Sequence, residues 1–130
     1  MYKKVLLPTD GSDLARTALA HAKYMAALGH ADVVILQVVD GGGGDNDAAE
    51  LNVREISEEM KFEDIGAVEC VVRRGDAART IVDVAHEEHA DLIVMATRGR
   101  SGLRRMVMGS VADSVARQAD CPVLLVTPQG

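Results

Sequence analysis

The residues best suited to chemistry lie in the turn between positions 96 and 110. Three glycines, Gly99, Gly102 and Gly109, leave main-chain amides open to close approach by an anion and can adopt positive φ. Gly109 and Ser110 then open a predicted helix, whose first N–H groups and dipole favour negative charge. Ser110 adds a hydroxyl donor. Together these features predict a phosphate-binding turn, although the spacing matches neither a P-loop nor a dinucleotide fingerprint.

Positive charge is concentrated in the same turn. Arg98, Arg100, Arg104 and Arg105 lie there with no acidic residue among them. The chain has 14 basic and 20 acidic residues, and removing these four positive charges from the net −6 leaves −10 on the rest. A cationic turn on an acidic protein favours a compact anionic ligand. The alternative is a solvated basic loop, which is the commoner role of a charge run.

Composition argues against nucleic acid and membranes as partners. A net charge of −6 repels polyanions and anionic lipid surfaces, and aromatic residues, the stacking platforms for single-stranded nucleic acid, make up only 2% of the chain. No apolar stretch approaches the ~20 residues of a membrane helix, and no cleavable apolar segment precedes the first strand. We therefore expect a cytoplasmic protein. Cys70 and Cys121 lack a CxxC pattern and are expected to be inert core thiols.

The elements that must position this turn alternate between strands and helices. Short apolar runs predict strands at Val5–Leu7, Asp32–Val39, Val68–Arg73, Leu92–Ala96 and Val123–Val126. Helices are predicted from Ser12 or Asp13 to about Gly29, and over Ala48–Phe62, Ala77–Glu88 and Ser110–Ala119.

This alternation, with strands apolar on both faces, predicts an α/β fold over residues 1–130 as one domain. The expected architecture is a doubly wound, Rossmann-like parallel sheet of five strands in the order 3-2-1-4-5, with helices on both faces. Ligands bind such sheets beyond the carboxyl ends of the strands at the switch point, here between the first and fourth strands. The turns after these two strands are the places to search for chemistry.

The chain resembles the universal stress proteins from Met1–Ser12 through to Cys121–Val126. Its ATP-binding members carry Gly, two residues, Gly, nine residues, then Gly with Ser or Thr. Gly99 and Gly109 with Ser110 match the last two glycines, whereas Ala96 stands at the first. If that glycine allows close approach, the Ala96 methyl would crowd the ligand; if it needs positive φ, Ala96 would be strained.

The resemblance implies that ATP or another adenine nucleotide binds, with or without Mg²⁺ or Mn²⁺. It implies a homodimer through Val123–Val126 and regulation of a protein partner not identified by the sequence. The triphosphate contacts that it implies are Gly99, Arg100, Ser101, Gly102, Gly109, Ser110 and Val111. The implied nucleoside contacts are Pro8, Thr9, Asp10 and the main chain at Val38. Ala96, Thr97 and Arg98 complete the expected site.

Several candidate groups have two interpretations. Asp10 would accept from a base or ribose or help to hold a divalent ion; otherwise it caps its own turn. Asp40 ends the second strand, where a ribose-binding acid is common, but a flexible glycine tract follows it. Asp83, His86 and His89 share one helix, yet the acidic residues between them favour an exposed face over a metal site.

No catalytic residues are assigned, because no nucleophile has an evident base beside it. The leading interpretation is a nucleotide-dependent regulatory module in the stress response. The alternatives are an interaction protein of the same fold with an empty pocket, favoured by Ala96, and a slow ATP-hydrolysing or adenylyl-transfer enzyme.

Overall fold

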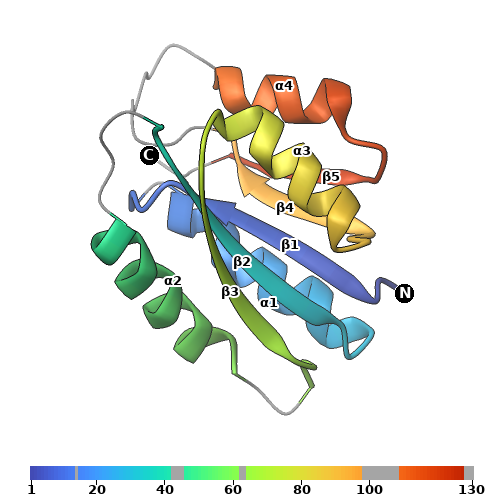
Figure 1. Cartoon of the computed structure of the whole chain (residues 1–130). Helices are drawn as coiled ribbons and strands as arrows, with labels where there is room; N and C mark the ends of the chain where they lie inside the picture. Colours follow the sequence, from blue (N-terminus) through green and yellow to red (C-terminus); the bar gives the residue numbers. More distant parts are fainter. Residues whose placement is uncertain (14, 42–45, 62–63, 98–108, 128–130) are drawn as a thin grey trace.

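The computed structural model describes residues 1–13, 15–41, 46–61, 64–97 and 109–127. Its five strands form one parallel sheet in the order β3-β2-β1-β4-β5 (Figure 1), which confirms the predicted fold class. The elements are β1 (Lys4–Thr9), a short 3₁₀ helix η1 (Ala15–Ala18), α1 (Leu19–Leu28), β2 (Asp32–Val39), α2 (Asn46–Met60), β3 (Val68–Arg74), α3 (Ala77–Glu87), β4 (Leu92–Ala96), α4 (Ser110–Gln118) and β5 (Val123–Val126).

The core has two layers because alternate strand residues face opposite sides of the sheet. Val5 and Leu7 pack among α1 and α2, whereas Leu6 packs among α3 and α4, and all three side chains are at most 2% exposed. Figure 1 shows α1 and α2 on one face and α3 and α4 on the other. Aliphatic side chains build both layers, and each fully buried Val, Leu, Ile or Met contributes roughly 1.5–3 kcal/mol.

The strand β1 continues through Pro8 to Thr9, so the prediction that it ends at Leu7 was wrong. Pairing between β1 and β4 stops at Leu6 and Ile93, whereas pairing with β2 continues through Pro8. Pro8 therefore lies where β1 has a partner on one side only. Its missing N–H interrupts no ladder there.

Other boundaries differ by small amounts. The first helix starts as a 3₁₀ turn, in which the Ala15 N–H donates to Ser12 Oγ at 3.1 Å, as expected of a capping serine. Helix α2 begins at Asn46, two residues before the predicted start. Cys70 is exposed on β3, so the expectation of two core thiols was wrong for it. The strand β3 is an edge strand, and its side chains are less covered than those of the central strands.

Candidate functional site

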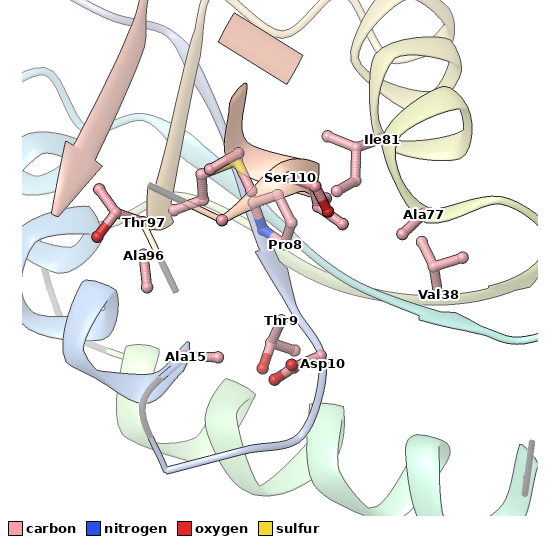
Figure 2. Close-up of a pocket in the computed structure, with 14 residues that line it drawn as sticks. Pro8, Thr9, Asp10, Ala15, Val38, Ala77, Ile81, Ala96, Thr97 and Ser110 are labelled. Carbon is pink, nitrogen blue, oxygen red and sulfur yellow. The ribbon is translucent and has the colours of Figure 1, made fainter. Parts of the chain in front are cut away.

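A pocket of about 290 Å³ lies at the carboxyl edge of the sheet, at the predicted switch point. It forms because β1 and β4 pair only at Val5–Leu92 and Leu6–Ile93 and carry no further pairing beyond these residues. Residues of both segments that follow the last pair line the pocket. The residues that line it are Pro8, Thr9, Asp10, Ala15, Val38, Ala77, Ile81, Met95, Ala96, Thr97, Gly109, Ser110, Val111 and Ala112 (Figure 2).

One wall of the pocket is aliphatic. Figure 2 shows Val38 and Ala77 together on one side and Ala96 with Thr97 on the opposite side. Ile81, on the first turns of α3, extends the wall formed by Val38 and Ala77. Such a surface suits the apolar faces of a base and a sugar, held between aliphatic groups.

The amino end of α4 forms a second, polar part of the pocket. Gly109 is the N-cap and provides no side-chain acceptor, and the first helical bond runs from Asp113 N–H to Gly109 O at 2.9 Å. The amides of Ser110 and Val111 precede that bond and carry the positive end of the helix dipole. This arrangement favours an anion at the helix start.

The backbone of Gly109 is extended, with φ −71° and ψ 160°. Any residue adopts these angles, so positive φ is not the reason for a glycine at this position. The explanation that remains is the absence of a side chain beside the first amides of α4.

Thr97 lies directly after β4 and is 4% exposed. Its N–H donates to Val126 O at 2.9 Å, and its carbonyl accepts from Gly109 N–H. Within the part of the chain that the structure describes, its buried Oγ1 has no hydrogen-bond partner. A buried hydroxyl without a partner is costly, so this atom is a candidate for a bond with a ligand or water.

The turn after β1 is built from its own side chains. Ser12 N–H donates to Asp10 Oδ1 at 2.9 Å, and Gly11 N–H donates to Thr9 Oγ1 at 3.1 Å. Gly11 has φ +85°, which favours glycine. Asp10 therefore caps its own turn and also lines the pocket, whereas Asp40 is exposed and is not among the lining residues.

Ala96 is the last residue of β4, is 8% exposed and pairs with Val126. Among the residues that the structure describes, only His30 and His89 combine a side chain with positive φ. Ala96 is therefore unstrained, and the interpretation based on positive φ was wrong. Its methyl group lines the pocket, so crowding of a ligand is the alternative that remains.

The pocket brings together two segments that the sequence assigned to one site from positions far apart, the turn after β1 and the start of α4. Nine of the candidate residues line it: Pro8, Thr9, Asp10, Val38, Ala96, Thr97, Gly109, Ser110 and Val111. The other five, Arg98, Gly99, Arg100, Ser101 and Gly102, lie outside the described residues, as do Arg104 and Arg105.

Sequence reasoning missed five lining residues: Ala15, Ala77, Ile81, Met95 and Ala112. The signal for Ala77 was the Gly75–Asp76 turn, since the third strand of a parallel sheet ends at the same edge as the first. Asp76 caps α3 by accepting from Arg79 N–H at 3.0 Å, which places the first turn of α3 beside the pocket. Ile81 and Ala112 follow the pattern of ordinary core residues, and nothing in their spacing marks a pocket.

Asp83 and His86 lie on α3, but His89 follows the end of that helix at Glu87 and has φ +57°, so the prediction that the three share one helix was wrong. His86 Nδ1 lies 3.5 Å from Asp120 Oδ2, and Asp83 pairs with Arg79 at 3.9 Å. Over the described ranges, no three His, Cys, Asp or Glu side chains are grouped to hold a metal ion. In the same ranges, no helix has the length and apolar character needed to cross a bilayer.

Comparison with known proteins places this geometry in a family. The model of the universal stress protein family matches residues 1–127. The chain belongs to the universal stress protein family. Universal stress protein MJ0531 of Methanocaldococcus jannaschii is 39% identical to it over 140 residues, which cover 97% of this chain and 82% of the relative.

Solved universal stress proteins have the same architecture. The structure of MJ0577 from Methanocaldococcus jannaschii superposes with a TM-score of 0.89 at 28% identity, covering 100% of this chain and 99% of the other. A universal stress protein solved in complex with cAMP superposes with a TM-score of 0.81 at 28% identity, covering 98% of both chains.

Proposed function

We propose that this universal stress protein binds an adenine nucleotide, ATP foremost, in the pocket at the carboxyl edge of its sheet. Occupancy of the pocket then regulates its contacts with a protein partner. The observation that carries the proposal is the joining, in one pocket, of an aliphatic wall at Val38, Ala77 and Ile81 with the uncapped amino end of α4. A nucleotide has the matching halves, an apolar base and an anionic phosphate chain.

The phosphates bind at the start of α4 in this proposal. The amides of Ser110 and Val111 and the Ser110 hydroxyl donate to phosphoryl oxygens, and the absent side chain at Gly109 lets the oxygens approach the amides. The buried Thr97 hydroxyl, on the Ala96 side of the pocket, supplies a further donor. Arginines of the turn 98–105 neutralise the remaining charge.

The nucleoside binds between β1 and the Val38–Ala77 wall. The volume of about 290 Å³ lies just below the roughly 300–1,000 Å³ range of small-molecule sites. Two further points support the assignment. A relative with a TM-score of 0.81 to this chain was solved with cAMP, and the Ala96 methyl is small and unstrained.

A divalent ion would arrive with the triphosphate. Among the described residues that line the pocket, Asp10 has the only carboxylate. Mg²⁺ binds through one or two carboxylates plus substrate phosphates, so Asp10 fits one such ligand position while phosphate and water supply the rest. No lining side chain in the described ranges pairs a nucleophile with a base, and we expect ATP turnover to be slow or absent.

Calorimetric titration of the wild-type protein with ATP, ADP, AMP and cAMP tests the proposal, with and without MgCl₂. We expect saturable 1:1 binding that is tightest for one adenine nucleotide, and nucleotide in acid extracts of the purified protein. Absence of heat and of extracted nucleotide would favour the interaction protein with an empty pocket. Sustained phosphate release under excess ATP would favour the enzyme.

We also propose that the protein forms a homodimer through β5. This strand pairs with β4 alone and leaves its other edge open, and three of its four apolar side chains are partly exposed. Thr97 N–H donates to Val126 O, which directs the main chain of Val126 toward β4. Because alternate residues of a strand direct their main-chain groups to opposite edges, Leu125 directs its N–H to the open edge.

Leu125→Pro removes that outward N–H without removing a bond to β4. We expect a dimer for the wild type and a monomer for this variant in light scattering coupled to gel filtration. A Leu125→Val variant keeps the donor and is expected to remain dimeric. A dimer that survives in a folded Leu125→Pro protein would place the interface elsewhere.

A further inference from the structure

The strand β2 extends past its neighbour β1 at the pocket. Pairing of β1 with β2 ends at Thr9 and Gln37, whereas pairing of β2 with β3 continues to Val39 and Arg74. The last two residues of β2 therefore have paired residues on β3 and none on β1. Val38, in this overhang, lines the pocket (Figure 2).

The hydrogen bonds of the overhang fix where its main chain points. Gly75 N–H donates to Val39 O at 2.9 Å, so the Val39 carbonyl faces β3. Alternation along a strand then directs the Val38 carbonyl to the opposite edge, where β1 has ended. The Gly11 N–H, two residues beyond the end of β1, is used within its own turn, where it donates to Thr9 Oγ1. The Val38 carbonyl is thus an acceptor directed toward the pocket side of β2.

Arg74, the last residue of β3, makes hydrogen bonds at the end of this overhang. Its Nη1 donates to Asp40 O at 2.8 Å, and its Nη2 donates to Asn46 Oδ1 at 2.7 Å. One guanidinium thus joins the end of β3, the residue after β2 and the first residue of α2. The planar fork of arginine donates in fixed directions, which a lysine does not reproduce. Its neighbour Arg73 instead forms an exposed pair with Glu87 at 2.9 Å.

We propose that Arg74 is a positioning residue that sets the preference of the pocket for adenine over guanine. This inference rests on the proposed nucleotide-binding function. An adenine offers a 6-amino donor to the Val38 carbonyl, whereas a guanine presents a 6-oxo acceptor that the same carbonyl repels. A site built to bond one polar group discriminates strongly only while its acceptor stays in place. Arg74 keeps it there by fixing Asp40, two residues along the chain.

The test measures the affinities of Arg74→Met and of the matched control Arg73→Met for ATP and for GTP by calorimetric titration. Arg74→Met keeps the aliphatic stem and loses both donors. We expect it to bind ATP about tenfold more weakly, which is about 1.4 kcal/mol, while its GTP affinity stays within about threefold of wild type. Arg73→Met, one residue away on the same strand, is expected to keep the wild-type ATP-to-GTP ratio.

Two further variants keep the inference open to refutation if Arg74→Met folds poorly. Asn46→Ala removes one of the two Arg74 partners and is expected to lower the ATP-to-GTP ratio by about threefold. Arg74→Lys, with a single point of donation, is expected to lie between wild type and Arg74→Met. The ratio of the two affinities is the decisive readout, because a general loss of stability weakens both nucleotides alike.

An unchanged ratio in folded Arg74→Met, or in Asn46→Ala, would overturn the role of Arg74 and leave nucleotide binding intact. Equal changes of the ratio in Arg73→Met and Arg74→Met would overturn it as well, because the effect would then come from charge on β3. If the wild-type protein binds no nucleotide, the proposed function itself fails, which the wild-type titration reveals separately.

Discussion

The two ends of the sheet use similar residues for opposite purposes. At the amino end, the Asp91 carboxylate accepts from Lys3 N–H at 2.8 Å and from Lys4 N–H at 3.0 Å. The Asp32 carboxylate accepts from Ala67 N–H at 2.9 Å. Each acidic side chain here fastens the start of one strand to a neighbouring segment, and the chain satisfies its own donors.

At the carboxyl end, side chains satisfy only some of the polar groups that need hydrogen-bond partners. Asp10 and Thr9 accept from the amides of Ser12 and Gly11, as their counterparts do at the other end. The start of α4, however, has no side-chain cap, and within the described ranges the buried Thr97 hydroxyl has no partner.

This difference indicates where a ligand belongs better than residue type does. Aspartate and glycine occur at both ends of the sheet, so their presence alone does not mark a site. A site is marked by polar groups that the fold buries or aligns without giving them a hydrogen-bond partner, so that a ligand can supply one. The following substitutions test that distinction, from the largest expected effect to the smallest.

Gly66→Val at the amino end is expected to destabilise the fold most. A Cβ at Gly66 would lie 2.3 Å from Asp32 Oδ1 and 3.2–3.3 Å from two carbonyl oxygens. The carboxylate must then move and release Ala67 N–H, or the backbone must shift. We expect a loss of about 1–3 kcal/mol in the free energy of unfolding, measured by urea denaturation.

The ATP affinity of folded Gly66→Val is expected to match wild type, because the pocket lies at the other end. Gly41→Val is the control, since a Cβ at Gly41 meets no atom of the described residues within 4 Å and should change stability by no more than about 0.5 kcal/mol. Similar stability losses in both variants would show that close packing does not distinguish the amino end.

Gly109→Val at the carboxyl end is expected to show the reverse pattern. Its extended backbone accepts any residue, so the fold should survive with little change in the urea midpoint. The new side chain stands beside the first amides of α4 and keeps phosphate away from them. We expect calorimetric ATP affinity to fall at least tenfold, about 1.4 kcal/mol.

The control for Gly109→Val is Ala116→Val, an exposed position in the second half of the same helix. It introduces the same side chain without approaching the amino end and should leave ATP affinity unchanged. Wild-type affinity in Gly109→Val would move the phosphate site away from α4, whatever the control shows.

The sequence predicts the sheet of this protein better than its pocket. The predicted bounds of β2, β4 and β5 match the structure because each strand contains an apolar run, and the side chains of β2 and β4 are largely buried on both faces, which leaves little freedom in composition. The extension of β1 through Pro8 was missed, since it depends on β4 ending its pairing at Leu6, a fact of three-dimensional register.

The pocket residues divide in the same way. Gly109 and Ser110 are recognisable because a glycine followed by a hydroxyl residue at a predicted helix start leaves the first helical amides open to an anion. Ala77 and Ile81 are not recognisable, because the inward face of an amphipathic helix has the same composition whether it packs on a strand or borders a cavity. The lack of strain at Ala96 required its backbone angles, which one sequence does not determine.

The smallest expected effect concerns Cys121, which precedes β5 at the closed amino end. Burial raises the pKa of its thiol above the ordinary value, and the nearby Asp120 and Asp91 carboxylates add to the rise. A raised pKa leaves less thiolate at a given pH, and thiolate is the form that reacts with maleimide. In a Cys70→Ser background, we expect Cys121 to be alkylated slowly at pH 8 and progressively faster as pH rises.

The reference is the same chain unfolded in guanidinium chloride, where the thiol regains its ordinary pKa. We expect the midpoint of the rate against pH to be higher in the folded protein, and saturating ATP to leave that midpoint unchanged. A midpoint equal to that of the unfolded chain would show that the amino end does not bury the thiol. A midpoint that moves with ATP would show that the two ends are coupled, because Cys121 lies outside the pocket and can sense a ligand only through the strands and helix α4 that lie between them.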